Sequence, residues 1–212
     1  MADSTPLSIS VVSHGQMALV RNLLTDLKQY CVAPPQIILT VNVPEAMPFD
    51  PAELGVSHVI HNASPKGFSA NHNAAFHFAE TPYFCVLNPD IRLTGDPFPV
   101  LIRHLTDRDV GAVAPAIVNP AGRLEDSARR FPTFGIIVMK ALGKAPRLDY
   151  EIGSAPIEPD WLAGMFLLLR SATFLEMGGF DERYFLYYED VDLNRRMRSA
   201  GYRVLLVPEV RV

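Results

Sequence analysis

The alternation of strand-like and helix-like segments in the first half of the chain constrains the fold more than any other feature. Short β-branched or apolar runs cover residues 8–13, 36–41, 56–60 and 82–87. Between the first two, apolar residues recur at helical spacing, and residues 69–80 resemble a second helix, capped by Ser69. Strands joined by helices usually pair in parallel, with helices on both faces. We therefore predict an α/β fold with a Rossmann-like, mostly parallel central sheet flanked by helices.

Polar residues follow several of these strands. Ligands of parallel sheets bind beyond the carboxyl ends of the strands, which directs attention to Ser13, Asn42 and the stretch "VLNPDI" at residues 86–91. If Asn88 and Asp90 continue the strand, they project to the same side. A carboxylate at this point could hold Mg²⁺ or Mn²⁺ together with phosphate oxygens and water. The tripeptide alone favours a plain turn, and both interpretations stay open.

The stretch "NASPKGFSANHNAAF" joins a loop to the second helix. Gly67 permits backbone conformations that other residues resist, and a helix opened by Ser69 has free N–H groups that suit an anion. Asn71 and Asn73 then lie on its first turns. An ordinary loop–helix junction explains these residues equally well. The stretch has neither the ending of a Walker loop nor a "GxGxxG" pattern.

Three carboxylates, Glu189, Asp190 and Asp192, follow the aromatic run "YFLYY". A helix over residues 190–200, ended by Gly201, places them in its first turn, where the helix dipole favours negative charge. Its arginines are then mostly solvated. The dipole does not explain the aromatic run before them, whereas a carboxylate at the edge of an apolar cleft suits a general base. Both interpretations remain.

Composition excludes several classes of protein. With 212 residues, 49% of them hydrophobic, the chain can form one domain with a full core. A net charge of −4 without a long Lys/Arg run argues against nucleic acid as a partner. We expect no transmembrane segment, because no apolar run reaches the ~18 residues required. The first residues do not resemble a secretion signal, and Cys31 and Cys85 are isolated thiols. We expect a cytoplasmic protein, free or peripheral at the inner face of the membrane.

Three separated segments resemble glycosyltransferase family 2, especially its rhamnosyltransferase-like branch. They are "GFSANHNAAF", "VLNPDI" and the long block over residues 160–212 that contains "GGFDERYFLYYEDVDL". The resemblance covers nearly the whole chain. It implies the GT-A fold in a single domain, residues 1–212, with a nucleotide-sugar-binding half at 1–95 and an acceptor and catalytic half at 96–212.

The resemblance also implies an activity in polysaccharide biosynthesis. It is inverting transfer of a sugar, rhamnose being one candidate, from a dTDP- or UDP-sugar to a hydroxyl of a glycan or lipid-linked acceptor. Asp90 matches the metal-binding aspartate, for Mg²⁺ or Mn²⁺, and Asp190 matches the catalytic base with Glu189 beside it. The implied donor-binding residues are Ser13, Asn42, Gly67, Asn73, Asn88 and Asp90, and the implied sugar and acceptor site contains Trp161, Gly164 and Met165.

The chain departs from the family pattern in two places. It reads "TVNVPE" after the second strand, where many relatives have an aspartate, and it ends at "PEVRV", before a histidine that commonly completes the metal or diphosphate site. Either that ligand is lacking or the chain is cut short. A catalytically weak or inactive nucleotide-sugar-binding domain of the same fold is therefore the alternative. A nucleotidyltransferase is disfavoured, because it would need a basic phosphate-binding loop near the first strand, and no lysine or arginine follows that strand until Arg21.

Two further segments have open interpretations. Arg129 and Arg130 are candidates for contact with a diphosphate or the acceptor, although solvated surface arginines are the favoured interpretation. The apolar run at residues 134–143 either packs in the core, which we favour, or meets a lipid-linked acceptor.

Overall fold

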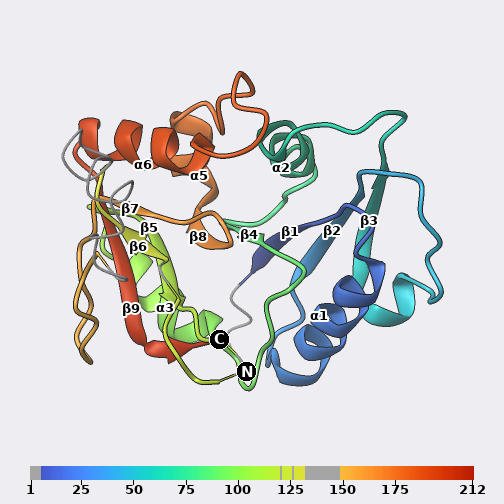
Figure 1. Ribbon diagram of the computed structural model, residues 1–212, viewed down its shortest axis with the longest axis horizontal. Coiled ribbons are helices and arrows are strands. Elements are labelled where there is room, and N and C mark those ends of the chain that lie inside the picture. The colour runs from blue at the N-terminus through green and yellow to red at the C-terminus, as the bar shows by residue number, and fades with distance from the viewer. Residues whose placement is uncertain (1–5, 120, 126, 132–148) are drawn as a thin grey trace, which may run out of the picture.

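The computed structural model describes residues 6–119, 121–125, 127–131 and 149–212, so the apolar run at 134–143 lies outside the described residues. A seven-stranded sheet forms its centre, in the order β3-β2-β1-β4-β8-β5-β9 (Figure 1). The strands are β1 (Leu7–Ser13), β2 (Gln36–Val41), β3 (Val56–His61), β4 (Tyr83–Leu87), β5 (Val110–Ala116), β8 (Phe166–Arg170) and β9 (Arg203–Arg211).

Most neighbouring strands of this sheet are parallel, as predicted. β1 pairs in parallel with β2 and β4, β2 with β3, and β5 with β9. β8 runs antiparallel to both of its neighbours, β4 and β5. Because β4 comes from the first half of the sequence and β8 from the second, this pairing joins the two halves in one sheet.

Helices cover both faces of the sheet (Figure 1). On one face lie α1 (Met17–Tyr30) and α3 (Phe98–Leu105), and on the other lie α2 (Phe68–Phe76), α5 (Ser171–Glu176) and α6 (Glu189–Ser199). Side chains of β8 alternate between two buried clusters: Phe166 and Leu168 pack with α1 and α3, and Leu167 and Leu169 with α5 and α6. This period of two is what a strand buried on both faces requires.

Smaller elements complete the described part. The 3-10 helix η1 (Ala52–Leu54) precedes β3, and the antiparallel pair β6 (Ala128–Arg129) and β7 (Trp161–Leu162) lies outside the main sheet. Within the described ranges, no helix has the length and apolar character needed to cross a bilayer.

The predicted bounds of α2, residues 69–80 with Ser69 as the cap, were wrong at both ends. The helix begins at Phe68, with Gly67 as the N-terminal flanking residue, so Ser69 lies inside the first turn and does not cap it. It ends at Phe76, because Phe78 and Ala79 donate backbone hydrogen bonds to residues three positions back, which tightens the chain into a turn. The last helix, α6, agrees within one residue with the predicted range, and Gly201 follows it at φ +92°.

The segment after β4 is held against α1 by a buried carboxylate. Asp26 of α1 accepts hydrogen bonds from Arg92 Nε at 2.6 Å, from Arg92 Nη2 at 2.9 Å and from the Leu93 amide at 3.0 Å. Burial raises the pKa of Asp26, but the bonds from Arg92 and Leu93 outweigh it and lower the pKa overall. The ion pair therefore positions the turn that carries Asp90.

Candidate active site

A cavity of about 570 Å³ opens beyond the end of β4, between the starts of α2 and α6 and the residues around β7. Six residues predicted from the sequence line it: Asn88, Trp161, Gly164, Met165, Glu189 and Asp190. These come from three distant stretches of the chain. The amide of Asn88 donates to the Met165 carbonyl at 2.9 Å, which joins the end of β4 to the start of β8.

Asp190 lies in the first turn of α6 and is oriented by two backbone amides. Its Oδ2 accepts a hydrogen bond from Gly164 N–H at 3.0 Å, and its Oδ1 accepts one from Val191 N–H at 2.8 Å. Burial raises the pKa of Asp190, and the amide hydrogen bonds and the charge of Arg129 oppose this rise. A carboxylate that is held in place and partly desolvated is suited to removing a proton from a hydroxyl.

Gly164 permits this close approach. A Cβ at this position would lie 3.1 Å from the Phe68 ring and 3.6 Å from Asp190 Cβ. A larger side chain would therefore push either the ring or the start of α6 away.

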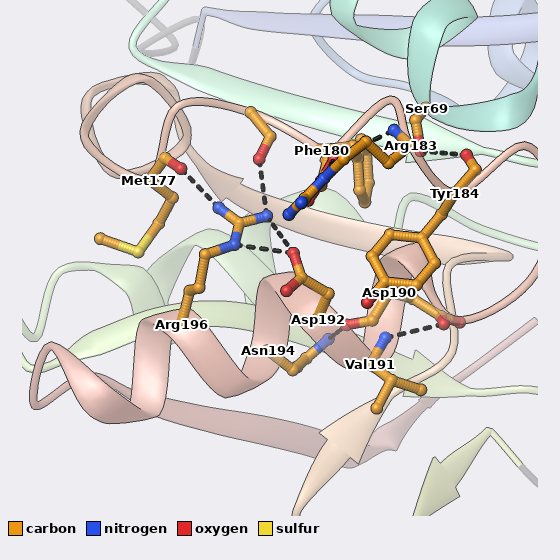
Figure 2. Close-up of polar contacts among 12 residues, drawn as sticks. Ser69, Met177, Phe180, Arg183, Tyr184, Asp190, Val191, Asp192, Asn194 and Arg196 are labelled. Carbon is orange, nitrogen blue, oxygen red and sulfur yellow. Dashed lines mark hydrogen bonds and ion pairs between the residues drawn. The ribbon is translucent and has the colours of Figure 1, made fainter.

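Asn194 fixes α6 against β7. Its Nδ2 donates to the Asp190 carbonyl at 2.7 Å and to the Leu162 carbonyl at 3.2 Å, and its Oδ1 accepts from Leu162 N–H at 3.2 Å. Figure 2 shows Asn194 next to Asp190 on the helix. Since Asn194 is fully buried, these bonds satisfy polar groups that water cannot reach, and they set the position of the Asp190 backbone.

Glu189 is the second carboxylate of the cavity wall. Its side chain is buried, and its Oε2 has no hydrogen-bond partner within the described residues. Burial, followed by the charge of Asp190, raises the pKa of Glu189 to about 6. The two adjacent carboxyls thus differ in surroundings: Asp190 is held by amides, whereas one oxygen of Glu189 is unpaired.

Arg196 is not solvated, contrary to the prediction for the arginines of this helix. It is half-buried, pairs with Asp192 one turn earlier at 2.7 Å, and donates to the carbonyls of Met177 and, at 2.9 Å, Gly179 (Figure 2). A sequence pattern could not show this, because the carbonyl partners belong to the segment after α5. Arg196 therefore ties that segment to α6, while its neighbour Arg195 is exposed as predicted.

The start of α2 is occupied by the chain itself. Phe68 N–H donates to the Phe185 carbonyl at 2.9 Å, and Ser69 Oγ donates to the Tyr184 carbonyl at 3.1 Å. A Cβ at Gly67 would collide with the Phe185 carbonyl. The predicted free N–H groups for an anion are therefore not all available, and Gly67 makes room for the aromatic segment at residues 184–188, which leads into α6.

Asn73 also holds the segment before α6. Its Nδ2 donates to the Phe180 carbonyl at 2.8 Å and to Glu182 Oε1 at 3.0 Å, and its Oδ1 accepts from Phe180 N–H at 2.9 Å. Asn73 and Gly67 are outside the cavity lining. Their contact with a donor stays a prediction, and the observed contacts are with residues of this chain.

Ser13 and Asn42 are buried at the ends of β1 and β2 and do not line the cavity. Ser13 Oγ accepts from Gln16 N–H at 3.2 Å. Asn42 Oδ1 accepts from Asn62 Nδ2 and from Lys66 N–H, both at 2.8 Å, and Asn42 Nδ2 donates to the Lys66 carbonyl at 3.0 Å. Both side chains thus organise local turns, and their predicted contact with a nucleoside remains a prediction.

Asn88 and Asp90 do not continue the strand, because the chain turns directly after β4. Ile91 N–H donates to the Asn88 carbonyl at 3.3 Å, which closes a turn around Pro89. Asn88 lines the cavity, whereas Asp90 is exposed and is not part of the lining. The tripeptide therefore forms the turn that its sequence favoured, and a metal-binding role of Asp90 stays a prediction.

Asp90 is chemically suited to hold a divalent cation with a ligand. Its carboxylate is exposed and accepts no hydrogen bond from the described residues, so it can bind without breaking a contact. Within those residues, no group of three or more His, Cys, Asp or Glu side chains could hold a metal ion. A cation bound at Asp90 would thus need oxygens from a ligand and from water, which Mg²⁺ and Mn²⁺ accept.

Two arginines that the sequence favoured as solvated surface residues lie in the cavity wall, where Arg129 is half-buried and Arg130 is exposed. Arg129 lies over the ring of Trp161, with its guanidinium carbon 5.4 Å from the ring centroid, and Arg130 lies over Tyr150 at 4.9 Å. Trp161 Nε1 donates to the Arg130 carbonyl at 3.0 Å. Both arginines line the cavity, as the sequence alternative allowed.

The sequence did not identify several other lining residues, including Phe68, Tyr187 and Tyr188. The aromatic run before Glu189 was the sequence signal that could have identified Tyr187 and Tyr188 as lining residues. Phe68 reaches the cavity only through the packing of α2 against the segments that follow β7 and precede α6.

Comparison with known proteins identifies relatives of this chain. Residues 52–165 match the family described as glycosyl transferase family 2. The chain is 33% identical over 153 residues to rhamnosyltransferase WbbL of Escherichia coli (strain K12), covering 67% of this chain and 58% of that protein. It is 36% identical over 137 residues to N-acetylglucosaminyl-diphospho-decaprenol L-rhamnosyltransferase of Mycobacterium tuberculosis, covering 60% of this chain and 45% of that protein. The chain therefore spans about half the length of these curated relatives.

Solved structures share the fold. GalNAc-T7 with UDP, GalNAc and Mn²⁺ has a TM-score of 0.75 at 14% identity, covering 100% of this chain and 44% of that one. The mannosyltransferase PcManGT of Pyrobaculum calidifontis with GDP-Man and Mn²⁺ has a TM-score of 0.68 at 14% identity, covering 97% and 55%. The predicted GT-A fold, with its mostly parallel sheet and flanking helices, is confirmed.

Arg196→Gln is expected to loosen the segment before α6. It removes the ion pair with Asp192 and the bonds to the Met177 and Gly179 carbonyls, and should lower the free energy of unfolding by about 1–3 kcal/mol. Urea unfolding measures this change. Arg195→Gln, on the exposed side of the same helix, is the control and should change stability by less than about 0.5 kcal/mol. Equal losses in both variants would contradict the role of Arg196.

Proposed function

The chain belongs to glycosyl transferase family 2, and we propose that it moves a sugar from a nucleoside diphosphate sugar to an acceptor hydroxyl with inversion at the anomeric carbon. The observation that supports this most directly is the position of Asp190. Its carboxylate is held by the Gly164 and Val191 amides in a cavity that also contains Asn88 of the β4 end. A base and the ligand-binding edge of the sheet thus share one space.

Asp190 is the proposed general base. It takes the proton of the acceptor hydroxyl as that oxygen attacks the anomeric carbon from the face opposite the diphosphate. General base catalysis contributes about 10²–10⁴-fold, so positioning supplies much of the remaining rate. The amides of Gly164 and Val191 and the Asn194 contacts restrict Asp190 to one orientation. Glu189, on the same wall, is proposed to support the base or bind the acceptor.

Asp90 and Asn88 are proposed to receive the diphosphate end of the donor. A divalent cation held by Asp90 would neutralise charge that develops on the leaving diphosphate. Two structural neighbours contain Mn²⁺ with a nucleotide or nucleotide sugar, which supports a divalent cation here without distinguishing Mg²⁺ from Mn²⁺. Four further residues keep their proposed role in donor binding, because they shape loops of the chain around the proposed donor site: Ser13, Asn42, Gly67 and Asn73.

The substrates are proposed from the relatives. Both curated relatives described above are rhamnosyltransferases, which favours rhamnose as the sugar. The dTDP- or UDP-linked donor is proposed from the family resemblance of the sequence alone. The name of the mycobacterial relative contains a diphospho-decaprenol, which favours a lipid-linked acceptor. We further propose one catalytic domain over residues 1–212, with the donor in the 1–95 half and the acceptor in the 96–212 half beside Trp161, Gly164 and Met165.

A domain that binds a nucleotide sugar without turnover is the second candidate. Its support is the exposed Asp90 carboxylate, which has no companion acidic or imidazole cluster within the described residues. Such a site would hold a cation weakly. A transfer assay with Mn²⁺ separates the two candidates.

Asp190→Asn should reduce transfer by at least about 10²-fold, because the amide cannot accept the acceptor proton. Donor binding should survive, since the asparagine keeps the shape and its single oxygen can still accept one of the two amide hydrogen bonds. Transfer rates and donor-dependent thermal shifts measure the two effects. Asp192→Asn, which alters a carboxylate paired with Arg196, is the control for a loss of folding. Near-normal turnover in Asp190→Asn would remove Asp190 from its role.

Removing divalent metal with a chelator should stop transfer, and added Mn²⁺ should restore it. Asp90→Ala should abolish the Mn²⁺-dependent part of donor binding, because it removes the protein carboxylate at the diphosphate end. Titration calorimetry with a nucleoside diphosphate, with and without Mn²⁺, measures this part. Asp109→Ala, at another exposed aspartate, is the control. Equal donor affinity in the Asp90 variant and the wild type would refute the assignment.

Transfer should also fall as the pH falls. A base must be ionised, and burial raises the pKa of Asp190 above the ordinary value of 3.8, so activity is present at higher pH and lost on acidification through this raised pKa. The pH dependence of kcat/KM measures the acid limb. Glu189→Gln removes the neighbouring carboxyl, whose pKa is about 6, and should keep an acid limb. If the acid limb of the kcat/KM profile disappears in Glu189→Gln, the titrating group is Glu189 and not Asp190.

A further inference from the structure

Exposed apolar side chains are concentrated at the mouth of the cavity. Nine large apolar side chains are exposed within the described residues, and five of them are consecutive. These five form the aromatic segment: Tyr184 (37% exposed), Phe185 (65%), Leu186 (54%), Tyr187 (72%) and Tyr188 (59%). The segment belongs to the connection between α5 and α6, which rises above α2, α5 and α6 at the top of Figure 1.

The exposure of these side chains is built into the backbone. The carbonyls of Tyr184 and Phe185 accept hydrogen bonds from Ser69 Oγ and Phe68 N–H, so the main chain is held against α2. Tyr187 and Tyr188 have φ values of 69° and 72°, a left-handed conformation that costs a residue with a side chain about 1–3 kcal/mol. The fold thus accepts both strain and apolar exposure at this segment, which indicates that the segment contacts something outside the chain.

The segment is continuous with the cavity. Leu186, Tyr187 and Tyr188 line the cavity as well as facing solvent, and Tyr188 directly precedes Glu189 and Asp190. A surface that covers this segment would therefore lie next to the cavity entrance.

We propose that the segment Tyr184–Tyr188 inserts into the interfacial region of a lipid bilayer and docks the protein with its cavity facing the membrane surface. Tyrosine suits this region because its ring is apolar and its hydroxyl is polar, and Phe185 and Leu186 supply the apolar contact. The proposal goes beyond the proposed function: vesicle binding requires no sugar transfer. Where both hold, docking places a lipid-linked acceptor beside Asp190.

Charges around the segment indicate how it binds. Arg183 pairs with Asp181 at 2.6 Å, Glu182 accepts a hydrogen bond from Asn73, and Lys66 precedes Gly67 at the contact with Phe185. With Glu189 and Asp190, which directly follow Tyr188, these neighbours comprise two cations and four acidic groups, so they carry no excess of positive charge. The attraction to anionic headgroups is thus small, and binding depends on apolar insertion with little sensitivity to salt.

A second copy of the chain fits the segment less well. A stable protein interface buries about 800 Å² and about 20–30 residues on each partner. The aromatic segment has five residues and projects from the surface, which suits insertion more than pairing of two faces.

Co-sedimentation with phosphatidylcholine vesicles tests the proposal. We expect the full chain to bind these vesicles, with similar affinity when about a fifth of the lipid is phosphatidylserine and at low and high salt. Phe185→Ser combined with Leu186→Ser should weaken binding about tenfold or more, because two apolar side chains no longer insert. Leu175→Ser combined with Val32→Ser is the matched control: Leu175 is 70% exposed and Val32 77%, both outside the segment, and binding should be unchanged.

Each outcome decides for or against the proposal. No binding by the wild type, equal binding by the segment variant, or an equal loss in the control variant would overturn it. Vesicle binding that requires phosphatidylserine and disappears at high salt would also overturn the proposal. So would a wild-type chain that binds no vesicles and instead forms a dimer in sedimentation velocity, if only the segment variant abolishes that dimer. Thermal unfolding of each variant confirms that it is folded. If the wild type binds vesicles but transfers no sugar, the docking proposal stands and the proposed function fails.

Discussion

The contact between the start of α6 and the residues that follow β7 is the constraint on which the site depends. Asp190 accepts the Gly164 amide, and Asn194 bonds to both polar groups of the Leu162 backbone. The bonds between Asn194 and Leu162 are buried, so losing one leaves a buried polar group unpaired at a cost of about 1–3 kcal/mol. The same bonds bring a carboxylate next to the antiparallel strand β8, and through β8 to the carboxyl end of β4.

The segment between α5 and α6 is organised by residues that pattern analysis treats as ordinary. Arg196 donates to carbonyls at the start of this segment, among them that of Gly179, and Asn73 donates to the Phe180 carbonyl. Gly67 leaves space for the Phe185 carbonyl. Together they explain how three carboxylates follow an aromatic run. Asp192 is neutralised by Arg196, and Asp190 accepts hydrogen bonds from two amides. The remaining cost of burial appears as raised pKa values of both Asp190 and Glu189.

The errors of sequence reasoning have a common physical origin. Ser69 was expected to cap α2 and its N–H groups to be free, but the carbonyls of Tyr184 and Phe185 lie there. The extended alternative for Asn88 and Asp90 does not apply, because the chain turns at Pro89. Arg196 was expected in solvent, but it reaches carbonyls of another segment. In each case, a partner more than a few residues away, or a local turn, determined the direction of the side chain.

The sequence by itself determined the four strands of the first half, the mostly parallel sheet and the family. Periods of two and 3.6 residues and motifs such as "VLNPDI" and "YYEDVDL" are local properties of the chain. Only the tertiary structure decided that Asn88, Trp161 and Asp190 share one cavity while Asp90, Asn73 and Ser13 do not line it. It also showed that the aromatic segment is exposed. These outcomes depend on hydrogen bonds and packing between distant segments, whose geometry exists only once the sheet has assembled.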